Sequence, residues 1–224
     1  MSGAAISLVA RVIANPTSAS VLDALLSDRV LTVGAIAAET GRARSTVSDA
    51  VSALAAAGLV VRRRRGRTTI VELASGEVAD ALEALGRLAE PPAPIGLRAA
   101  SRMEALRRAR TCYDHLAGEV GVAIADRLLC RGVLSTAPDG TWQLGEDGRR
   151  HLVHRGVDPA LIAAAGRRPL VRACSDWTEH RPHLAGRVGG AICSLMLQTG
   201  MVRRLPTSRA VRLTAAGEAW LAEL

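Results

Sequence analysis

Thiol and imidazole side chains, the groups best suited to metal binding and redox chemistry, are confined to the second half of the chain. The four cysteines and five histidines all follow residue 110, at Cys112, His115, Cys130, His151, His154, Cys174, His180, His183 and Cys193. Thiolate together with imidazole suits zinc, other soft divalent metals or haem. We therefore expect any sensing chemistry in this half.

A duplicated motif places several of these groups at equivalent positions. R-x-C-x-D occupies 110–114 and 172–176, and H-L-A-G-x-V-G-x-A-I occupies 115–124 and 183–192, with W-T-E-H-R-P inserted at 177–182. Copies this similar usually pack about a pseudo-two-fold axis, so equivalent positions should meet. The expected site for a metal, haem or another effector draws on Cys112, Asp114, His115, Cys174, Asp176, His180 and His183.

Two other interpretations of these segments stay open, because C-x-D is not a standard metal-ligand spacing. Cys112 and Cys174 could be redox thiols, activated by nearby arginines or by a protonated histidine. Alternatively, each segment starts a helix, with Asp114 and Asp176 as N-caps and the cysteines as small buried residues.

The elements that would hold these residues follow from the rest of the repeat. Each copy, about 110–155 and 172–224, predicts helix, short hairpin and helix, the outline of a winged-helix-like unit. The glycines of H-L-A-G-x-V-G indicate close helix packing, since they remove Cβ bulk. Cys130 and Cys193 lie in apolar stretches, which predicts core positions for both.

The first half is organised around residues 31–73. They predict a helix, a tight turn, a second helix and a two-stranded hairpin. Gly41 can take the left-handed conformation that ends a helix. Val47, Val51 and Leu54 recur at helical spacing and give the second helix one apolar face. This order of elements predicts a winged helix-turn-helix.

Small polar and cationic side chains cover the rest of this stretch. Such side chains let a helix enter the DNA major groove, where arginine reaches phosphates or guanine edges. On the second helix and its turn they are Arg42, Arg44, Ser45, Thr46 and Ser48. The expected tip of the hairpin, which would grip phosphates or a minor groove, carries Arg62, Arg63, Arg64, Arg65 and Arg67.

The sequence of this stretch resembles the ArsR family of bacterial repressors. The resemblance lies in T-V-S-D-A-V-S-A-L-A-A-A-G-L-V-V-R-R-R-R-G-R-T-T-I-V-E-L. The opening A-N-P-T-S-A-S-V-L-D-A-L-L is similar to that family's opening as well. The resemblance covers roughly residues 5–88. It implies a homodimer that reads a palindromic operator, with helices at 4–14 and 76–88 paired across a two-fold axis.

One family feature is missing from this chain. Many relatives carry a Cys-x-Cys metal site on the first helix of the helix-turn-helix, whereas residues 35–39 here read A-I-A-A-E. The second half resembles the C-terminal extension of a less characterised subgroup that shows CYDHLAG-like and DWTE-like segments. The resemblance therefore implies DNA binding by the first half and moves any sensing to the second.

The net charge indicates the kind of partner, and the positions of the prolines indicate the domain boundary. The net charge of +8 and the pI near 10.9 favour an anionic partner. Prolines at 91, 92 and 94 cannot continue a helix. We expect a mainly α fold with small β-hairpin wings (α+β): a DNA-binding and dimerisation domain at 1–89, a linker or arm helix at 90–109, and a duplicated sensor domain of two winged-helix-like units at 110–224.

Several classes of protein are disfavoured. No long charge-free apolar run predicts a membrane span, and the first residues do not read as a signal peptide, so we expect a cytoplasmic protein with reduced thiols. The motifs G-x-x-x-x-G-K-[ST], G-x-S-x-G and H-E-x-x-H are absent, so we do not expect an enzyme.

The sequence thus predicts a transcriptional regulator that represses by occupying its operator. A metal, haem, redox or small-molecule signal in the second half would release it from DNA. Two alternatives remain: a DNA-binding protein without effector whose repeat is only structural, and a ligand-binding or enzymatic module that uses the winged helix as a scaffold.

Overall fold

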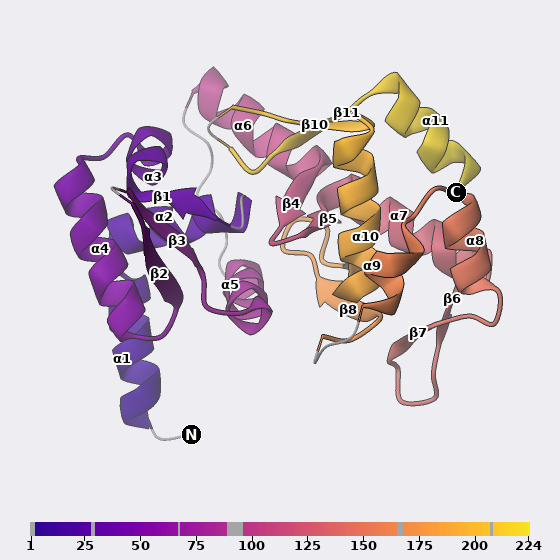
Figure 1. Ribbon diagram of the computed structural model, residues 1–224, viewed down its shortest axis with the longest axis horizontal. Coiled ribbons are helices and arrows are strands. Elements are labelled where there is room, and N and C mark those ends of the chain that lie inside the picture. The colour runs from indigo at the N-terminus through magenta and orange to yellow at the C-terminus, as the bar shows by residue number, and fades with distance from the viewer. Residues whose placement is uncertain (1–2, 28–29, 67, 89–95, 165–167, 207) are drawn as a thin grey trace. The chain divides into compact units, whose positions relative to one another are not determined.

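The computed structural model describes residues 3–27, 30–66, 68–88, 96–164, 168–206 and 208–224 (Figure 1). The chain divides into two compact units. The first comprises Met1–Leu82 with Pro206–Arg209, and the second comprises Glu83–Leu205 with Ala210–Leu224. Whereas the sequence suggested a linker at 90–109, this division falls at residue 83 and assigns residues 96–109 to the second unit. The prolines of the expected boundary lie outside the described residues.

The first unit opens with two helices, α1 (Gly3–Ile13) and α2 (Pro16–Ser27). Asn15 caps α2, because its Oδ1 accepts hydrogen bonds from the backbone N–H groups of Thr17 and Ser18 at 2.9 and 3.1 Å. The inward face of α2, which includes Val21 and Leu25, is fully buried. This face anchors the helices that follow.

The helix-turn-helix has the predicted form. Helix α3 (Val33–Thr40) begins after Thr32, whose side chain accepts a hydrogen bond from Ala35 N, and ends at Gly41 with φ of 64°. Helix α4 (Arg44–Ala56) buries the predicted apolar face, Val47, Val51 and Leu54, each at most 1% exposed. The opposite face of α4 is thereby turned to solvent.

The wing is an antiparallel pair, β2 (Val60–Arg65) and β3 (Thr68–Leu73), extended by the short strand β1 (Leu31–Thr32) on the other side of β3. Arg62 pairs with Val71 and Arg65 with Thr68. The sequence placed these arginines in the tip, and that was wrong. They lie in the strand, because β-branched partners across the ladder continue the pairing to Arg65. Helix α5 (Gly76–Leu88) follows.

The second unit contains the two copies of the repeat after α6 (Leu97–Arg108). The first copy is β4 (Arg110–Cys112), β5 (His115–Ala117), α7 (Gly118–Cys130), β6 (Leu134–Thr136), β7 (Trp142–Leu144) and α8 (Gly148–His154). Helix α9 (Pro159–Ala163) follows, and the second copy is β8 (Arg172–Ser175), β9 (Pro182–Ala185), α10 (Gly186–Gln198), β10 (Val202–Arg204), β11 (Val211–Leu213) and α11 (Ala215–Glu223). Each copy is therefore hairpin, helix, hairpin and helix.

The first hairpin of each copy differs from the expectation that C-x-D begins a helix. Asp114 and Asp176 follow strands, and the helices start four and ten residues later, at Gly118 and Gly186. Both glycines have left-handed φ angles of 76° and 82°. An added Cβ at Gly118 would lie 2.5 Å from the Arg107 carbonyl oxygen, so the end of α6 lies close to the start of α7.

The two copies interlock through their first hairpins and helices. Helix α7 of one copy packs against β9 of the other, and α10 packs against β5. The predicted close packing is confirmed at Gly121 and Gly189, where a Cβ would lie 2.4 Å from a carbonyl oxygen of the same copy. The core of the unit is made from both copies and includes Leu128, Val188 and Met196. None of the described helices has the length and apolar character needed to cross a membrane.

Candidate functional site

The outer face of α4 is a candidate nucleic-acid interface. Arg44, Ser45, Thr46 and Ser48 are all exposed, and Val47 on the opposite face fixes the rotation of the helix. Arg42 in the preceding turn is half-buried. The side chains on this face are either short and polar or cationic, so a DNA backbone can approach the helix closely.

The wing carries its arginines on exposed strand positions. Arg62 donates a hydrogen bond to Ser52 Oγ of α4 at 2.8 Å, and Arg63 pairs with Glu72 at 3.4 Å. Arg64 and Arg65 are exposed, and Arg67 lies outside the described residues. Through Arg62 the wing contacts the exposed face of α4.

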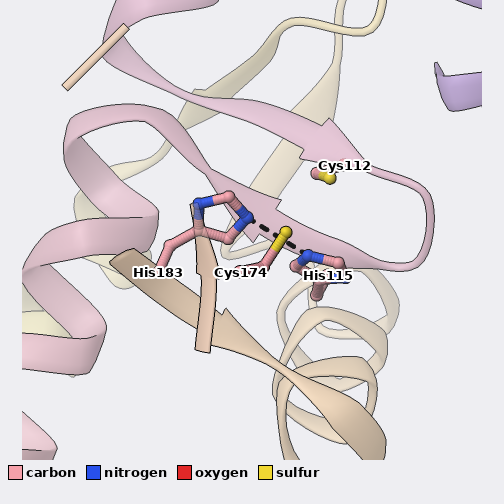
Figure 2. Close-up of side chains that lie close together, drawn as sticks. All are labelled: Cys112, His115, Cys174 and His183. Atoms are coloured by element: carbon pink, nitrogen blue, oxygen red, sulfur yellow. Dashed lines mark hydrogen bonds between the residues drawn. The ribbon is translucent and has the colours of Figure 1, made fainter. Parts of the chain in front are cut away.

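A second cluster lies entirely within the second unit. One side-chain donor atom from each of Cys112, His115, Cys174 and His183 lies within 4.8 Å of the others, and all four residues are buried (Figure 2). Cys112 pairs with His115 across the first hairpin, and Cys174 pairs with His183 across the equivalent hairpin. Each copy therefore supplies one thiol and one imidazole.

A carboxylate oxygen lies beside the Nδ1 atom of each imidazole. His115 Nδ1 lies 3.3 Å from Asp114 Oδ1, and His183 Nδ1 lies 3.1 Å from Asp176 Oδ2. The second contact has the distance of an ion pair, although the ring N–H is not well aligned on the oxygen. The two Nε2 atoms face one another at 3.2 Å, as the dashed line in Figure 2 shows.

The electrostatics of the cluster favour a thiolate. Contact with the Cys112 thiol, together with both imidazoles, holds the pKa of Cys174 far below its usual range, against the effect of burial. Burial disfavours charge on His183, but Asp176 and Cys174 outweigh it and raise its pKa to about 9. By contrast, burial raises the pKa of Cys193 to about 12, which leaves it an inert core thiol as predicted.

Three of the seven predicted site residues stay outside the cluster itself. Asp114 and Asp176 support the histidines instead of joining them, and Asp176 Oδ2 also accepts a 2.7 Å hydrogen bond from Gly118 N, at the start of the other copy's helix. His180 is exposed in the loop between β8 and β9, with φ of 53°, so the inserted segment carries it away. Cys130, predicted to be core, is exposed because it ends α7.

The sequence did not reveal a buried charge network beside the cluster. Arg110, fully buried, contacts Asp176 at 2.9 Å and Glu83 of α5 at 3.4 Å. It also donates to Thr178 Oγ1 at 3.0 Å and lies over the Trp177 ring at 4.8 Å. The repeated R-x-C-x-D motif was the available signal, since it places an arginine two residues before each cysteine.

A winged helix-turn-helix with an exposed basic face defines a DNA-binding transcriptional regulator, not an enzyme. A model of the helix-turn-helix domain family matches residues 13–63. The chain is also 30% identical over 213 residues to the "Uncharacterized HTH-type transcriptional regulator YdfF" of Bacillus subtilis (strain 168), a match that covers 95% of this chain and 93% of that protein. The chain belongs to this family of HTH-type transcriptional regulators.

Solved structures of similar proteins cover the smaller part of the chain. Mb0332 of Mycobacterium bovis, described as a homodimeric winged helix-turn-helix domain and a possible ArsR-family regulator, is 30% identical over 37% of this chain and 75% of that one, with a TM-score of 0.35. Reduced HlyU of Vibrio cholerae is 30% identical over 38% of this chain and 88% of its own, also with a TM-score of 0.35.

Proposed function

We propose that this regulator represses transcription by occupying a palindromic operator as a homodimer. The observation that carries the proposal is the exposed polar face of α4 beside the arginine-rich wing, joined by the hydrogen bond from Arg62 to Ser52. Arg44, Ser45, Thr46 and Ser48 would meet bases and nearby phosphates, while the wing arginines would hold the flanking backbone. Such a regulator works where the chromosome is, in the cytoplasm.

Apolar side chains left in solvent support the dimer. Ile6 and Leu8 on α1 are 55% and 54% exposed, and Leu85 and Leu88 on α5 are 48% and 81% exposed. Helices α1 and α5 are those that the ArsR resemblance pairs across a two-fold axis. A second copy of the chain would cover these side chains, and two recognition helices would then read two half-sites.

The second unit would supply the control. Its Cys/His cluster is the one group of thiol and imidazole side chains gathered in the described part of the chain, and the DNA-binding unit has neither residue type. A signal received there would change the affinity of the dimer for DNA. The competing functions are an effector-independent DNA-binding protein and a scaffold whose winged helix does not bind DNA.

Fluorescence anisotropy with the DNA upstream of the protein's own gene tests the proposal. Arg44→Ala should cost about 1–3 kcal/mol of binding free energy, and Arg62→Ala should reduce the slope of log K against log salt by about one. Arg149→Ala removes the same charge from an exposed position of α8 and should leave affinity unchanged. Absence of binding at low salt would contradict the regulator function proposed here.

A further inference from the structure

We propose that Cys112, His115, Cys174 and His183 form a closed tetrahedral site for zinc or a similar divalent transition-metal ion. In this proposal the bound ion is also the signal that sets the affinity of the regulator for DNA. The four donors come in equal numbers from the two copies, so a bound ion would fasten the copies together. The site itself is independent of the function proposed above, whereas its regulatory role rests on that function.

The spacing of the donors suits a small ion. A tetrahedral zinc with two nitrogen and two sulfur ligands has edges of about 3.3–3.8 Å, given bonds of about 2.0 and 2.3 Å. The two Nε2 atoms lie 3.2 Å apart, and all four donor atoms lie within 4.8 Å of one another. An ion at the centre would draw the donors together by roughly 1 Å at most.

A carboxylate lies beside Nδ1 of both imidazoles. A carboxylate near Nδ1 favours the tautomer with hydrogen on Nδ1, which leaves a lone pair on Nε2. Asp114 and Asp176 stand in this position, within 3.3 and 3.1 Å of Nδ1 of His115 and His183. Two Nε2 lone pairs that meet at 3.2 Å repel one another unless a proton or a cation lies between them.

The protein holds this geometry rigidly on both sides. The position of a Cβ on Gly121 lies 3.4 Å from His183 Cβ, and that of a Cβ on Gly189 lies 3.3 Å from His115 Cβ. Each helix therefore backs the histidine of the other copy through a glycine that leaves no spare room. Preorganised ligands of this kind raise metal affinity, because little ordering remains to be done on binding.

The surroundings disfavour larger ligands. A porphyrin plane cannot pass between nitrogens 3.2 Å apart. Four buried protein donors also fill a tetrahedral shell, so the site suits a resident or regulatory ion and not a catalytic one.

A chain of buried charges leads from this site to α5. Asp176 lies against His183 on one side and 2.9 Å from Arg110 on the other, and Arg110 reaches Glu83. Helix α5 runs without a break from the residues of the first unit into those of the second. A shift of His183 on metal binding would thus be felt at a helix continuous with the DNA-binding unit.

The test uses the full chain, prepared reduced and without chelators. Elemental analysis should find about one zinc per chain, and cobalt substitution should give the intense visible bands and the thiolate charge-transfer band of tetrahedral S₂N₂ coordination. Cys112→Ser with Cys174→Ser should abolish the stoichiometric metal. Cys130→Ser and His180→Gln are matched controls, both exposed and outside the cluster, and should retain it.

Each alternative result is decisive. If the unmodified chain binds neither zinc nor cobalt stoichiometrically, or if mass spectrometry shows a reversible Cys112–Cys174 disulfide that forms in place of metal binding, the site is overturned. This arm does not depend on the variants folding. A metal content unchanged in the double variant would overturn the ligand assignment.

The regulatory arm compares DNA affinity of the zinc-loaded and the chelator-treated chain. We expect a change of about tenfold, within the range of ordinary allosteric coupling. Metal binding without any change in DNA affinity would overturn the regulatory role and leave the site standing. Failure of both forms to bind DNA would instead refute the proposed repressor, so the two failures are distinguishable.

Discussion

The two copies of the repeat offer the cluster the same pair of ligands but hold them in different surroundings. Asp176 is fully buried and contacts Arg110, Thr178 and the first turn of α7. Its counterpart Asp114 is paired with Arg168, which is 35% exposed. Burial is offset by these partners in both copies, and the pKa of each carboxyl lies well below its usual range.

The difference arises from the six residues inserted in the second copy. They supply Trp177 and Thr178, which enclose Arg110 and exclude water from its pair with Asp176. A symmetric set of ligands is thus backed by an asymmetric set of charges. In the first copy the carboxylate contacts His115 and Arg168. In the second copy the carboxylate contacts His183 and also connects it to α5 through Arg110.

The largest effect that would test this comparison is on stability. Arg110→Met keeps most of the side-chain volume but leaves Asp176 and Glu83 as uncompensated buried charges, so the free energy of unfolding should fall by about 3–5 kcal/mol. Arg168→Met removes the corresponding partner of Asp114 and should cost about 1 kcal/mol or less. Denaturant unfolding measures both. Equal losses would mean that the two copies are not energetically different.

Gly121→Ala and Gly189→Ala probe the symmetric part of the comparison. Each added methyl would lie 2.4 Å from a backbone oxygen and against the histidine of the other copy. Both variants should lose about 1–3 kcal/mol of stability and shift the cobalt spectrum. Gly34→Ala, whose Cβ would meet nothing closer than 3.7 Å, is the control and should not destabilise. A loss confined to one of the two glycines would break the symmetry argued here.

The smallest effects should appear in the metal affinity of the carboxylate variants. Asp114→Asn should weaken zinc binding about tenfold, and Asp176→Asn by about ten- to a hundredfold, because each removes the carboxylate charge beside Nδ1 of the histidine. Competition with a chelator measures each affinity. Fluorescence anisotropy of DNA binding then separates the two variants, because only Asp176→Asn should also remove the response of DNA affinity to zinc. An identical response in the two variants would argue against the route through Arg110.

The sequence was sufficient for the first unit because its signals are local. Val47, Val51 and Leu54 repeat within one helix, and Gly41 marks the turn beside it. The wing was placed less well, since nothing in a run of four arginines indicates where a strand ends. Pairing with Thr68–Leu73 across the ladder decided it.

The candidate site was foreseen only in part. Symmetry of the motif predicted that the copies meet, and four of the predicted side chains do so. The hairpins that carry them were missed, because strands of three or four residues are too short to show a period. The contact of Arg110 with Asp176 joins residues 66 positions apart, a separation at which sequence pattern carries no information on pairing.

The hydrogen bond that Asp176 accepts from Gly118 N caps the start of α7, and this has a consequence for the synthesis of the protein. The two residues are 58 positions apart, so the start of α7 leaves the ribosome well before its cap exists. At about 5–20 residues per second that interval is roughly 3–12 seconds. During it, the face of α7 that will meet β9 has no partner, and the first copy cannot close by itself. Synthesis of the second copy thus supplies the contacts that complete the first.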